Sequence, residues 1–536
     1  MRIENLLRQN AVRRPDHPAV ITDGTELTWS ELDTATDRLA HALIDRGYRE
    51  QERIALVLAN DHRVVVAYHG LWKANLVTVG VNPKLTATEM RRILVHSGAS
   101  AVICDSATAV EAAAGAPAVR RIVTVGQVGT GQAQAGQAEI EIESFDELVA
   151  SGADGPVPGE RGGVSVFSGS DLRSLRYTSG TTGAAKGCMA THDQQLASTA
   201  NYLCEVDVPR GGPTWISMPL SLGVGASFVT TTAYLGVPLL LRRRFDGAAF
   251  VDDVERYGVT HAFLVPTMLV DLVAALPGLD ASRARSLSLI GYGGAATSWN
   301  LIRSLVEALD VRLYHAFGAT EAGGFAALLT PDDHDRLLAT GPTSIVPVGR
   351  PAAFAEVQLV DGEDRVVEPR EVGEMRIRAA SVFSGYWSQP EATRAVLRDG
   401  WLRLGDMAWR DEQGYIYLAD RAQGVIRSGA QNVYAGEVEA VLQSCPGVHR
   451  AAVIGVPDER YGESVKALVQ RTEGSEVTAQ QVIEHCAEQL SAYKRPREVA
   501  FVDSLPVDEG GKIRRAELSS GTGLALLGTA TKESGR

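Results

Sequence analysis

The sequence predicts an α/β protein: a large N-terminal body of layered α/β subdomains with a β section, followed by a small mobile α+β C-terminal domain. The chain has 536 residues, more than one hydrophobic core usually holds. From residue 53 to about residue 315, apolar strand-like segments alternate with helical patterns, as in a mainly parallel, layered sheet. After about residue 341, short strand-like segments lie between turns that contain Gly and Pro, which indicates an antiparallel section.

The elements of the body follow from apolar runs and helical periodicity. We expect strands at residues 53–58, 76–81, 101–104, 121–125, 214–218, 237–241, 260–265, 286–290 and 311–315. We expect helices at residues 62–73, 193–204, 248–257 and 299–309. Residues 127–164 are rich in Gly, Ala and Gln, so we expect a long surface loop there.

The C-terminal part divides into a β section and a small domain. The β section has expected strands at 356–360, 374–378 and 415–418. The small domain has expected helices at 433–444 and 479–490 and strands at 448–456 and 465–470. We therefore predict a body at residues 1–420, a hinge at 421–424, a cap domain at 421–518 and a disordered tail at 519–536.

Composition excludes several classes of protein. The net charge of −13 argues against a general nucleic-acid binder, which needs a surplus of Lys and Arg. The five cysteines are scattered without a Cys-x-x-Cys pair, which fits a reducing cytosol and predicts a cytoplasmic protein. The N-terminus lacks the apolar run of a signal peptide, and no apolar stretch is long enough to span a membrane.

The most informative stretch is residues 177–187, Tyr-Thr-Ser-Gly-Thr-Thr-Gly-Ala-Ala-Lys-Gly, which follows a strand-like segment. Backbone N–H groups freed by glycine, hydroxyl donors and the mobile cation of Lys186 suit a polyphosphate. The Walker pattern is absent, because it needs Gly-Lys-Ser/Thr and here Lys186 stands between Ala185 and Gly187. The alternative is a flexible surface loop.

A second glycine cluster follows the expected strand at 286–290. Residues 291–296, Gly-Tyr-Gly-Gly-Ala-Ala, match the Gly-x-Gly-x-x-Ala turn of dinucleotide-binding proteins, with Asp310 downstream. Taken alone, this match indicates an NAD enzyme. The alternative is a tight turn between a strand and a helix.

Three later clusters carry polar groups suited to a nucleotide. Glu321 is a hard oxygen ligand suited to Mg²⁺, and Thr320 beside it offers a hydroxyl to a phosphate. The Asp406 carboxylate can accept both hydroxyls of a ribose, and the Arg421 guanidinium can contact ribose or phosphate. Lys512 follows Gly510-Gly511 in an expected mobile loop. Each cluster, taken alone, also fits a solvated surface turn.

The order of these clusters resembles the adenylate-forming superfamily, which includes acyl-CoA synthetases, aryl-CoA ligases, nonribosomal adenylation domains and firefly luciferase. The shared order is Tyr-Thr-Ser-Gly-Thr-Thr-Gly-x-x-Lys-Gly, Gly-Gly-Ala, Gly-x-Thr-Glu, Gly-Asp, Asp-Arg and a late Gly-Lys. It spans nearly the whole chain, from Leu27 to Lys512, and is closest in look to acyl-CoA synthetases. Under this resemblance Gly294-Ala295-Ala296 is the adenine-binding loop, which weakens the NAD interpretation.

The resemblance implies a function for each matching residue. Catalytic residues would be Lys512, Thr320, Glu321 and Lys186, and Glu321 would also hold the metal. ATP would be bound by Thr178, Ser179, Gly180, Thr181, Thr182, Gly183, Lys186, Gly294, Ala295, Ala296, Phe317, Gly318, Thr320, Asp406, Arg421 and Lys512. The substrate pocket would include Leu222, Gly293, Gly318 and Ala319. Gln423 would be the hinge, and Gly429, Asn432 and Tyr434 would line the CoA channel.

The expected reaction uses ATP, Mg²⁺ and CoA. The enzyme would activate a small-molecule carboxylic acid as an acyl adenylate, release pyrophosphate and transfer the acyl group to CoA. The alternative acceptors are a carrier-protein thiol, an amine, or an aryl amine after activation of nitrite, as in ATP-dependent diazotases. A catalytically inactive binding or scaffold protein is a further alternative. We expect no nucleic-acid partner and no membrane span, and the oligomeric state stays open.

Five positions depart from the family pattern. Ala185 and Ala435 stand where Pro is common, and Phe317 stands where Tyr is usual. Leu222 replaces a His that borders the acyl pocket, which predicts an unusual acid. Gln423 replaces the Asp or Lys of the hinge. We therefore expect adenylation, with an acid that the sequence does not identify.

Overall fold

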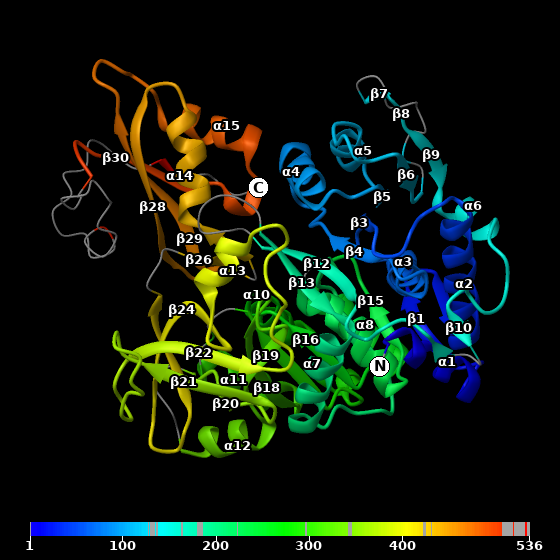
Figure 1. The fold of residues 1–536 in the computed structure, drawn as a ribbon. Coiled ribbons are helices and arrows are strands. Elements are labelled where there is room, and N and C mark those ends of the chain that lie inside the picture. Colours follow the sequence, from blue (N-terminus) through cyan, green and yellow to red (C-terminus); the bar gives the residue numbers. More distant parts are fainter. Residues whose placement is uncertain are drawn as a thin grey trace.

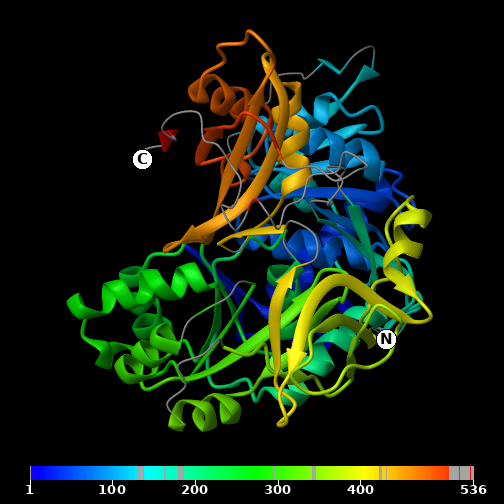
Figure 2. The same ribbon diagram turned by 90° about the vertical axis from the view of Figure 1, so that its left-hand side faces the viewer.

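The structure is a computed structural model of the chain. It describes residues 2–126, 128, 134–135, 138–161, 164–178, 186–221, 223–294, 297, 299–340, 346–421, 425–429, 431–505, 518 and 531–532. Figures 1 and 2 show two views of the fold, with the C-terminal part in orange in the upper half of each view. No helix in the described part of the chain is long and apolar enough to cross a membrane.

A first, mainly parallel sheet holds most of the predicted strands of the second half of the body. Its strands are β1 (Pro18–Thr22), β2 (Thr25–Thr28), β14 (Thr214–Ile216), β15 (Leu239–Leu241), β16 (His261–Leu264), β17 (Leu289–Gly293), β18 (Arg312–Ala319), β19 (Gly324–Leu329) and β20 (Arg350–Pro351). Their order in space is β2-β1-β15-β14-β16-β17-β18-β19-β20, with parallel pairs from β1 to β18. The end of β18 therefore lies beside the end of β17, deep in the sheet.

A second sheet holds the predicted phosphate stretch at its edge. Its strands are β3 (Arg53–Val57), β4 (Val77–Gly80), β5 (Ala101–Cys104), β6 (Arg121–Thr124), β9 (Glu141–Ser144), β12 (Leu172–Thr178) and β13 (Lys186–Thr191). Their order is β13-β12-β4-β3-β5-β6-β9, parallel except for the β12–β13 pair. Both faces of β4 and β5 are buried, as expected for a central parallel strand.

Helices cover both faces of the two sheets. They are α1 (Glu4–Arg13), α2 (Trp29–Asp45), α3 (His62–Lys73), α4 (Ala87–Ser97), α5 (Ala107–Ala114), α6 (Phe145–Ala150), α7 (His192–Glu205), α8 (Gly223–Leu235), α9 (Gly247–Tyr257), α10 (Pro266–Ala275), α11 (Trp299–Leu309) and α12 (Pro331–Ala339). Several begin where a Thr side chain and a Glu or Gln three residues later cap each other's backbone N–H. Thr28 with Glu31 and Thr191 with Gln194 are two such capping boxes.

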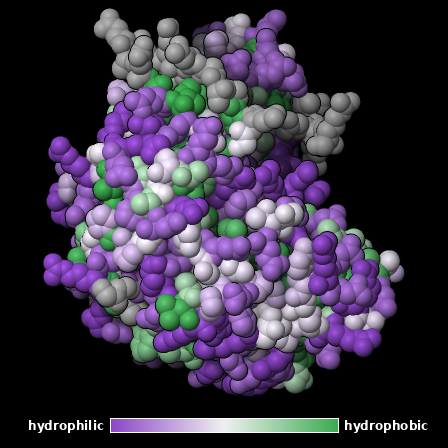
Figure 3. Space-filling view, turned by 90° about the vertical axis from the view of Figure 1, so that its right-hand side faces the viewer, coloured by the Kyte–Doolittle hydropathy of each residue, from purple (hydrophilic) through white to green (hydrophobic). Residues whose placement is uncertain are grey.

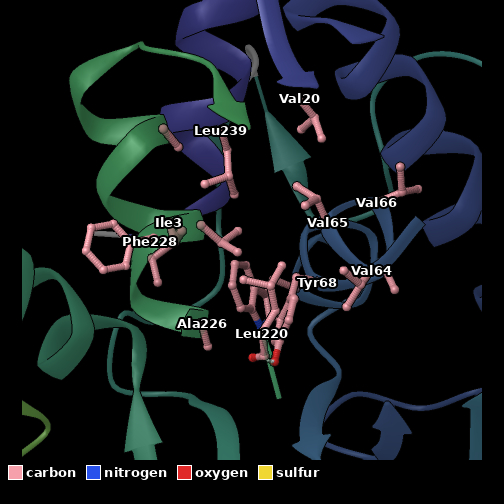
Figure 4. Close-up of a cluster of buried hydrophobic side chains, with 14 of the residues drawn as sticks. Ile3, Val20, Val64, Val65, Val66, Tyr68, Leu220, Ala226, Phe228 and Leu239 are labelled. Atoms are coloured by element: carbon pink, nitrogen blue, oxygen red, sulfur yellow. Dashed lines mark hydrogen bonds between the residues drawn. The ribbon is translucent and has the colours of Figure 1, made fainter. Parts of the chain in front are cut away.

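The largest hydrophobic cluster lies between the two sheets. It joins Leu56 of one sheet and Leu239 of the other to apolar side chains of α2, α3 and α8. Figure 4 shows part of this cluster, with Val65 and Tyr68 of α3 and Ala226 and Phe228 of α8 among the side chains drawn. Separate clusters cover the outer faces, one under α9 to α11 and one under α4 and α5. The body is thus a layered α/β structure, as predicted.

The β section forms its own antiparallel sheet, with one helix beside it. It contains β21 (Ala355–Val360), β22 (Gly373–Ala379), α13 (Pro390–Val396), β23 (Leu397–Arg398), β24 (Trp401–Arg410) and β25 (Ile416–Arg421). The chain changes to another sheet between β25 and β26, at residues 422–424, which lie outside the described residues. The position of this change agrees with the predicted hinge, which stays a prediction.

The C-terminal domain, called the cap below, has its own core. It contains β26 (Val425–Ser428), β27 (Gln431–Tyr434), α14 (Ala435–Ser444), β28 (Val448–Asp458), β29 (Gly462–Arg471), α15 (Ala479–Gln489), β30 (Glu498–Phe501) and β31 (Thr531–Lys532). Apolar side chains of both helices pack on β28 and β29 in one cluster. In Figure 1 this domain stands next to α4 of the body.

Two expectations differ from the structure. The predicted loop at 127–164 contains β9, α6 and the short strands β7 (Gln134–Ala135), β8 (Ala138–Glu139), β10 (Glu160–Arg161) and β11 (Val164–Ser165). Strand β9 lies at the edge of the described sheet, where it pairs with β6. An edge strand is less buried, so the Glu-Ile-Glu-Ser sequence of β9 needs little apolar character. In the predicted tail, Thr531–Lys532 pairs with β30, whose open edge accepts it.

The surface is mainly polar on the face shown in Figure 3. Apolar residues are scattered over it among hydrophilic ones. Isolated apolar residues of this kind are normal on a folded protein and indicate no special surface. The features that bear on function are therefore buried polar groups and contacts between the cap and the body.

Candidate active site

The predicted phosphate stretch connects two paired strands. Strand β12 ends at Thr178 and β13 begins at Lys186, and these residues are opposite each other in antiparallel register. The residues between them, 179–185, lie outside the described part of the chain. The chain thus leaves and re-enters the edge of the second sheet at one place, with Lys186 on the returning strand.

Lys186, Tyr386 and Glu321 form a cluster at this place. The Tyr386 hydroxyl donates a hydrogen bond to Glu321 Oε1 at 2.8 Å. The Lys186 Nζ lies 5.1 Å from the centroid of the Tyr386 ring, within the range of a cation–π contact. Tyr386 is 4% exposed and Glu321 8% exposed. One phenol side chain therefore links the predicted phosphate-binding lysine to the predicted metal ligand.

The backbone holds this cluster together from three elements. Residues 383–387 pair with the start of β13 and with the turn after β18. The Trp387 N–H donates to the Gly187 carbonyl at 2.8 Å, and the Phe383 N–H donates to the Glu321 carbonyl at 2.9 Å. Burial raises the pKa of the nearby Cys188 thiol well above its usual range, and the negative charge of Glu321 raises this pKa further. The thiol therefore stays protonated.

Glu321 and Thr320 follow β18 and offer hard oxygen donors. Among the described residues, no group of three or more His, Cys, Asp or Glu side chains could hold a metal ion. Mg²⁺ that binds with a nucleotide uses one or two protein carboxylates and takes its other oxygens from phosphates and water. One buried carboxylate beside a hydroxyl fits this kind of Mg²⁺ site.

Thr320 lies close to the start of α8 and to Arg176 of β12. A Cβ built on Gly223 would lie 3.6 Å from Thr320 Oγ1 and 3.9 Å from Arg176 Nη1. The neighbouring Leu222 lies outside the described residues, so its predicted place in the substrate pocket stays a prediction. The ends of β12 and β18 and the start of α8 thus converge from both sheets.

The glycine cluster after β17 has a packing explanation. A Cβ on Gly291 would lie 2.0 Å from the Tyr314 ring, and a Cβ on Gly293 would lie 2.3 Å from the Ala316 carbonyl oxygen. Gly294 has φ +90°, which only glycine adopts readily. The adjacent strand β18 requires Gly291 and Gly293, and the positive φ favours Gly294. The match to a dinucleotide-binding turn is therefore explained without a bound dinucleotide. Ala295 and Ala296 lie outside the described residues.

Asp406 and Arg421 are brought together by strand pairing. They are opposite each other in the antiparallel pair β24–β25, 15 residues apart in the chain. Asp406 is 4% exposed. The register places both at the end of the β section that leads into the cap. Their predicted contacts with the ribose stay predictions.

Three other predicted site residues lie on β18 and differ in their exposure to solvent. Phe317 is 7% exposed and packs in the cluster of the β section, so stacking on a purine stays a prediction. Ala319 is half-buried and Gly318 is exposed. A Cβ on Gly318 would lie 1.8 Å from the Gly324 carbonyl oxygen, so the close pairing of β18 and β19 requires glycine there.

The hairpin of β26 and β27 brings the cap against the body. Its turn residue Gly429 has φ +63°, and a Cβ built on it would lie 3.3 Å from Thr267 Cγ2 of α10. Burial, and to a lesser extent the charges of His334 and of Arg427 on β26, lower the pKa of His315 on β18 to about 4. Asn432 and Tyr434 lie on β27. The predicted CoA-channel segment therefore lies against the body near β18.

Two predicted residues of the cap are not described. Gln423 and Lys512 lie outside the described residues, together with 179–185, Leu222, Ala295 and Ala296. The structure brings Thr178, Lys186, Glu321 and Thr320 to the neighbouring ends of β12, β13 and β18, and it pairs Asp406 with Arg421. The roles assigned to all of these residues stay predictions.

Three features of the site were missed in the sequence. Tyr386 follows a strand by seven residues and no local pattern marks it. Arg173 and Arg176 are charged residues in a strand that is buried in a sheet. This combination is unusual, so the sequence could have indicated these two residues as part of a site. The third is an ion pair between the cap and the body, in which Lys494 Nζ lies 3.0 Å from Glu89 Oε1 of α4.

Comparison with known proteins identifies the family. The model of the AMP-binding enzyme family matches residues 7–387, and the model of the AMP-binding enzyme C-terminal domain matches residues 437–512. A feruloyl-CoA synthase from Amycolatopsis sp. is 33% identical over 94% of this chain and 96% of that protein. The fatty acid–[acyl-carrier-protein] ligase ScoC from Streptomyces coeruleorubidus is 31% identical over 95% of this chain and 94% of that protein.

Solved structures show the same fold. The o-succinylbenzoate CoA synthetase from Bacillus subtilis, as a double mutant with its product analogue OSB-NCoA, superposes with a TM-score of 0.83 at 25% identity, covering 98% of this chain and 99% of that chain. The same enzyme with the acyl-adenylate intermediate OSB-AMP gives 0.68 at 26% identity, covering 96% and 97%. The chain therefore belongs to the AMP-binding enzyme family and is an adenylate-forming ligase of the acid–CoA ligase type.

Proposed function

We propose that the chain joins a small carboxylic acid to CoA in two steps at one site. In the first step a carboxylate oxygen attacks the α-phosphate of ATP, pyrophosphate leaves, and an acyl adenylate forms. In the second step the CoA thiol displaces AMP. The observation that carries the second step is the close approach of the cap hairpin to the body, at Gly429 and Thr267.

The first step brings an anionic carboxylate to an anionic phosphate, so charge neutralisation and positioning dominate its catalysis. Lys186 and the loop that it closes would bind the β- and γ-phosphates. Glu321 would hold Mg²⁺, which when bound neutralises phosphate charge. The Tyr386 hydroxyl, 2.8 Å from Glu321 Oε1, would fix the carboxylate in this role. Lys512 would neutralise the α-phosphate and the attacking oxygen.

The arrangement of the cap supports the second step. The same B. subtilis enzyme superposes with a TM-score of 0.83 in its complex with the product analogue and 0.68 in its complex with the adenylate. A difference of this size for one enzyme is expected when a domain turns as a rigid body. The orientation described here is therefore the one that we assign to thioester formation, with Gly429, Asn432 and Tyr434 beside the thiol.

A carrier protein is a specific competitor of CoA as the acceptor. ScoC is named as a ligase for an acyl-carrier protein, and a carrier protein presents the same kind of thiol as CoA. We favour CoA because the feruloyl-CoA synthase, a relative named for CoA, is at least as similar to this chain as ScoC is. The use of ATP and CoA, together with five free cysteines, supports a cytoplasmic location.

The experiment measures both steps separately. Purified protein is mixed with ATP, Mg²⁺ and a panel of acids, and pyrophosphate release is followed with and without CoA. We expect release with at least one acid and thioester formation only when CoA is added. Replacing CoA by a phosphopantetheinylated carrier protein or by an amine should give no product. Product with the carrier protein alone would overturn the choice of CoA.

Lys512→Ala distinguishes the two steps. It should reduce pyrophosphate release by orders of magnitude, because the loss of one charge at the reacting phosphate raises the barrier by several kcal/mol, about tenfold in rate for each 1.4 kcal/mol. Thioester formation from supplied acyl adenylate should be unchanged. An equal loss in both steps would remove Lys512 from its assigned role.

A further inference from the structure

Two arginines at the active site have no acidic partner among the described residues. Arg173 and Arg176 lie on β12, just before the predicted phosphate loop, and are 0% and 6% exposed. A β-bulge between Leu172 and Ser174 turns Arg173 toward the same side as Arg176. Both guanidinium groups donate to Oε1 of Gln195 on α7, Arg173 at 2.9 Å. Two cations therefore converge on one neutral oxygen.

No carboxylate of the residues that the structure describes neutralises the two arginines. In the described part of the chain neither arginine forms an ion pair, and Arg173 Nε, Arg173 Nη1 and Arg176 Nε are buried without a hydrogen-bond partner. Burial lowers the pKa of both groups, and for Arg173 the charge of Arg176 lowers it further. A buried charge without a partner is costly, and natural proteins keep one mainly where a ligand supplies the opposite charge.

Two other cations in the described part of the chain, Lys73, which is buried, and Arg8, which is half-buried, show the usual arrangement. Arg8 contacts the carboxylates of Asp33, Asp37 and Glu160, and Lys73 contacts those of Asp33 and Asp37. The same fold thus pairs its structural cations with acids. Arg173 and Arg176 differ from them in partner and in position, because they lie at the site where the nucleotide and the acid meet.

Arg176 reaches the reaction centre. Its Nη1 lies 3.9 Å and its Cδ 3.8 Å from the Cβ position of Gly223, and Thr320 Oγ1 lies 3.6 Å from the same point. The family resemblance implies that Thr320 contacts the α-phosphate of ATP. Ser221, two residues before Gly223, has a buried hydroxyl without a partner in the described residues. Arg173 lies behind Arg176, with its guanidinium carbon 4.7 Å from the centroid of the Trp72 ring.

We propose that Arg173 and Arg176 form a binding site for a compact planar oxyanion of the substrate. A guanidinium fork matches the two oxygens of such an anion. The anion would be the second carboxylate of a short dicarboxylic acid, or a small free oxyanion such as nitrite that takes the place of the acid. This inference rests on the proposed function, since it names the substrate class of the same site.

The test compares matched substrates. Pyrophosphate release is measured with malonate, succinate, glutarate and adipate, with the monomethyl ester of each, and with nitrite in the presence of an aryl amine. One dicarboxylate should exceed its ester by about 100-fold or more in kcat/KM, because the ester leaves both guanidinium groups unpaired. Activity with nitrite alone would assign the site to a free oxyanion. Equal activity of every acid and its ester, without activity on nitrite, would overturn the oxyanion site.

Variants give a readout that does not need catalysis. Arg176→Met should abolish the rise in Tm that the dicarboxylate or nitrite gives the wild-type protein in the absence of ATP. Its own Tm should equal or exceed that of the wild type, because it removes an unpaired buried charge. The matched control Arg8→Met should lower Tm and keep the response to the anion.

The outcomes separate the two proposals. Pyrophosphate release that is insensitive to Arg176→Met would overturn the oxyanion site and leave the proposed function intact. Absence of pyrophosphate release with every substrate would refute the proposed function, while the thermal shifts would still decide the oxyanion site. An anion response that survives Arg176→Met would overturn the site in either case.

Discussion

Removal of the positive charge of Lys494 should release the cap from the orientation described here. Lys494 Nζ lies 3.0 Å from Glu89 Oε1, and the Ser491 hydroxyl donates to Glu89 Oε2 at 2.6 Å. The side chains of Lys494 and Glu89 are each 5% exposed. Glu89 also accepts from the Thr86 N–H in the capping box of α4. One carboxylate of the body therefore holds two residues of the cap.

The magnitude follows from the burial of this pair. Removal of one partner of a buried ion pair costs about 3 to 5 kcal/mol, because the remaining charge is left uncompensated. Ser491 and Thr86 still contact Glu89 in the Lys494→Met variant, so we take the lower end of this range of free energies. About 3 kcal/mol corresponds to a shift of roughly 100-fold in the equilibrium between cap orientations. Because this orientation is assigned to thioester formation, that step should slow by up to this factor.

The assay is single-turnover kinetics of each step. Lys494→Met should slow thioester formation from supplied acyl adenylate and leave the rate of pyrophosphate release within about twofold. The matched control is Lys466→Met, which breaks the 2.6 Å pair of Lys466 with Glu498 inside the cap. That variant should affect neither rate. Equal slowing of both steps by Lys494→Met, or no slowing, would refute the role of the pair.

The pair also predicts a pH dependence. Burial alone would raise the pKa of Glu89, but Lys494, Ser491 and the Thr86 N–H outweigh it and hold the pKa below its ordinary value of 4.5. A carboxyl with a lowered pKa stabilises the folded arrangement above its ordinary pKa, and this contribution is lost as the pH falls. The thioester step should therefore keep the benefit of the pair at neutral pH and lose it below about pH 4.5.

The remaining predictions concern the body. Tyr386→Phe removes the 2.8 Å hydrogen bond to Glu321, so the Mg²⁺ concentration at half-maximal pyrophosphate release should rise about tenfold, with Tm nearly unchanged. An unchanged Mg²⁺ titration would separate Tyr386 from the metal site. Gly318→Ala should lower Tm and the free energy of unfolding, because its Cβ would lie 1.8 Å from the Gly324 carbonyl oxygen. A wild-type Tm for this variant would show that β18 and β19 can separate.

Local sequence was sufficient for elements with strong periodicity or marked ends. The helix at 299–309 and the strand at 101–104 agree with α11 and β5 at both ends, since each is a regular amphipathic or fully apolar segment. The segment at 141–144 was missed because an edge strand needs few apolar residues. The phosphate stretch was recognisable because its glycines, hydroxyls and lysine are contiguous.

Contacts between distant residues could not be predicted in this way. Glu89 and Lys494 are separated by 405 residues, and each alone fits an exposed helix or turn. Tyr386 meets Glu321 only because residues 383–387 pair with β13 and with the turn after β18. Arg173 joins Arg176 through a bulge, which the alternation of a regular strand does not predict. These groups depend on tertiary structure, and they carry the new inferences about the site.

The formation of an acyl adenylate is the central claim, and isotope transfer tests it most directly. The protein is incubated with ATP, Mg²⁺, CoA and an accepted acid labelled with ¹⁸O in its carboxylate, and the products are analysed by mass spectrometry. Because a carboxylate oxygen attacks the α-phosphate, AMP should carry one ¹⁸O atom for each thioester formed. Unlabelled AMP, or ADP with the label in inorganic phosphate, would contradict the account.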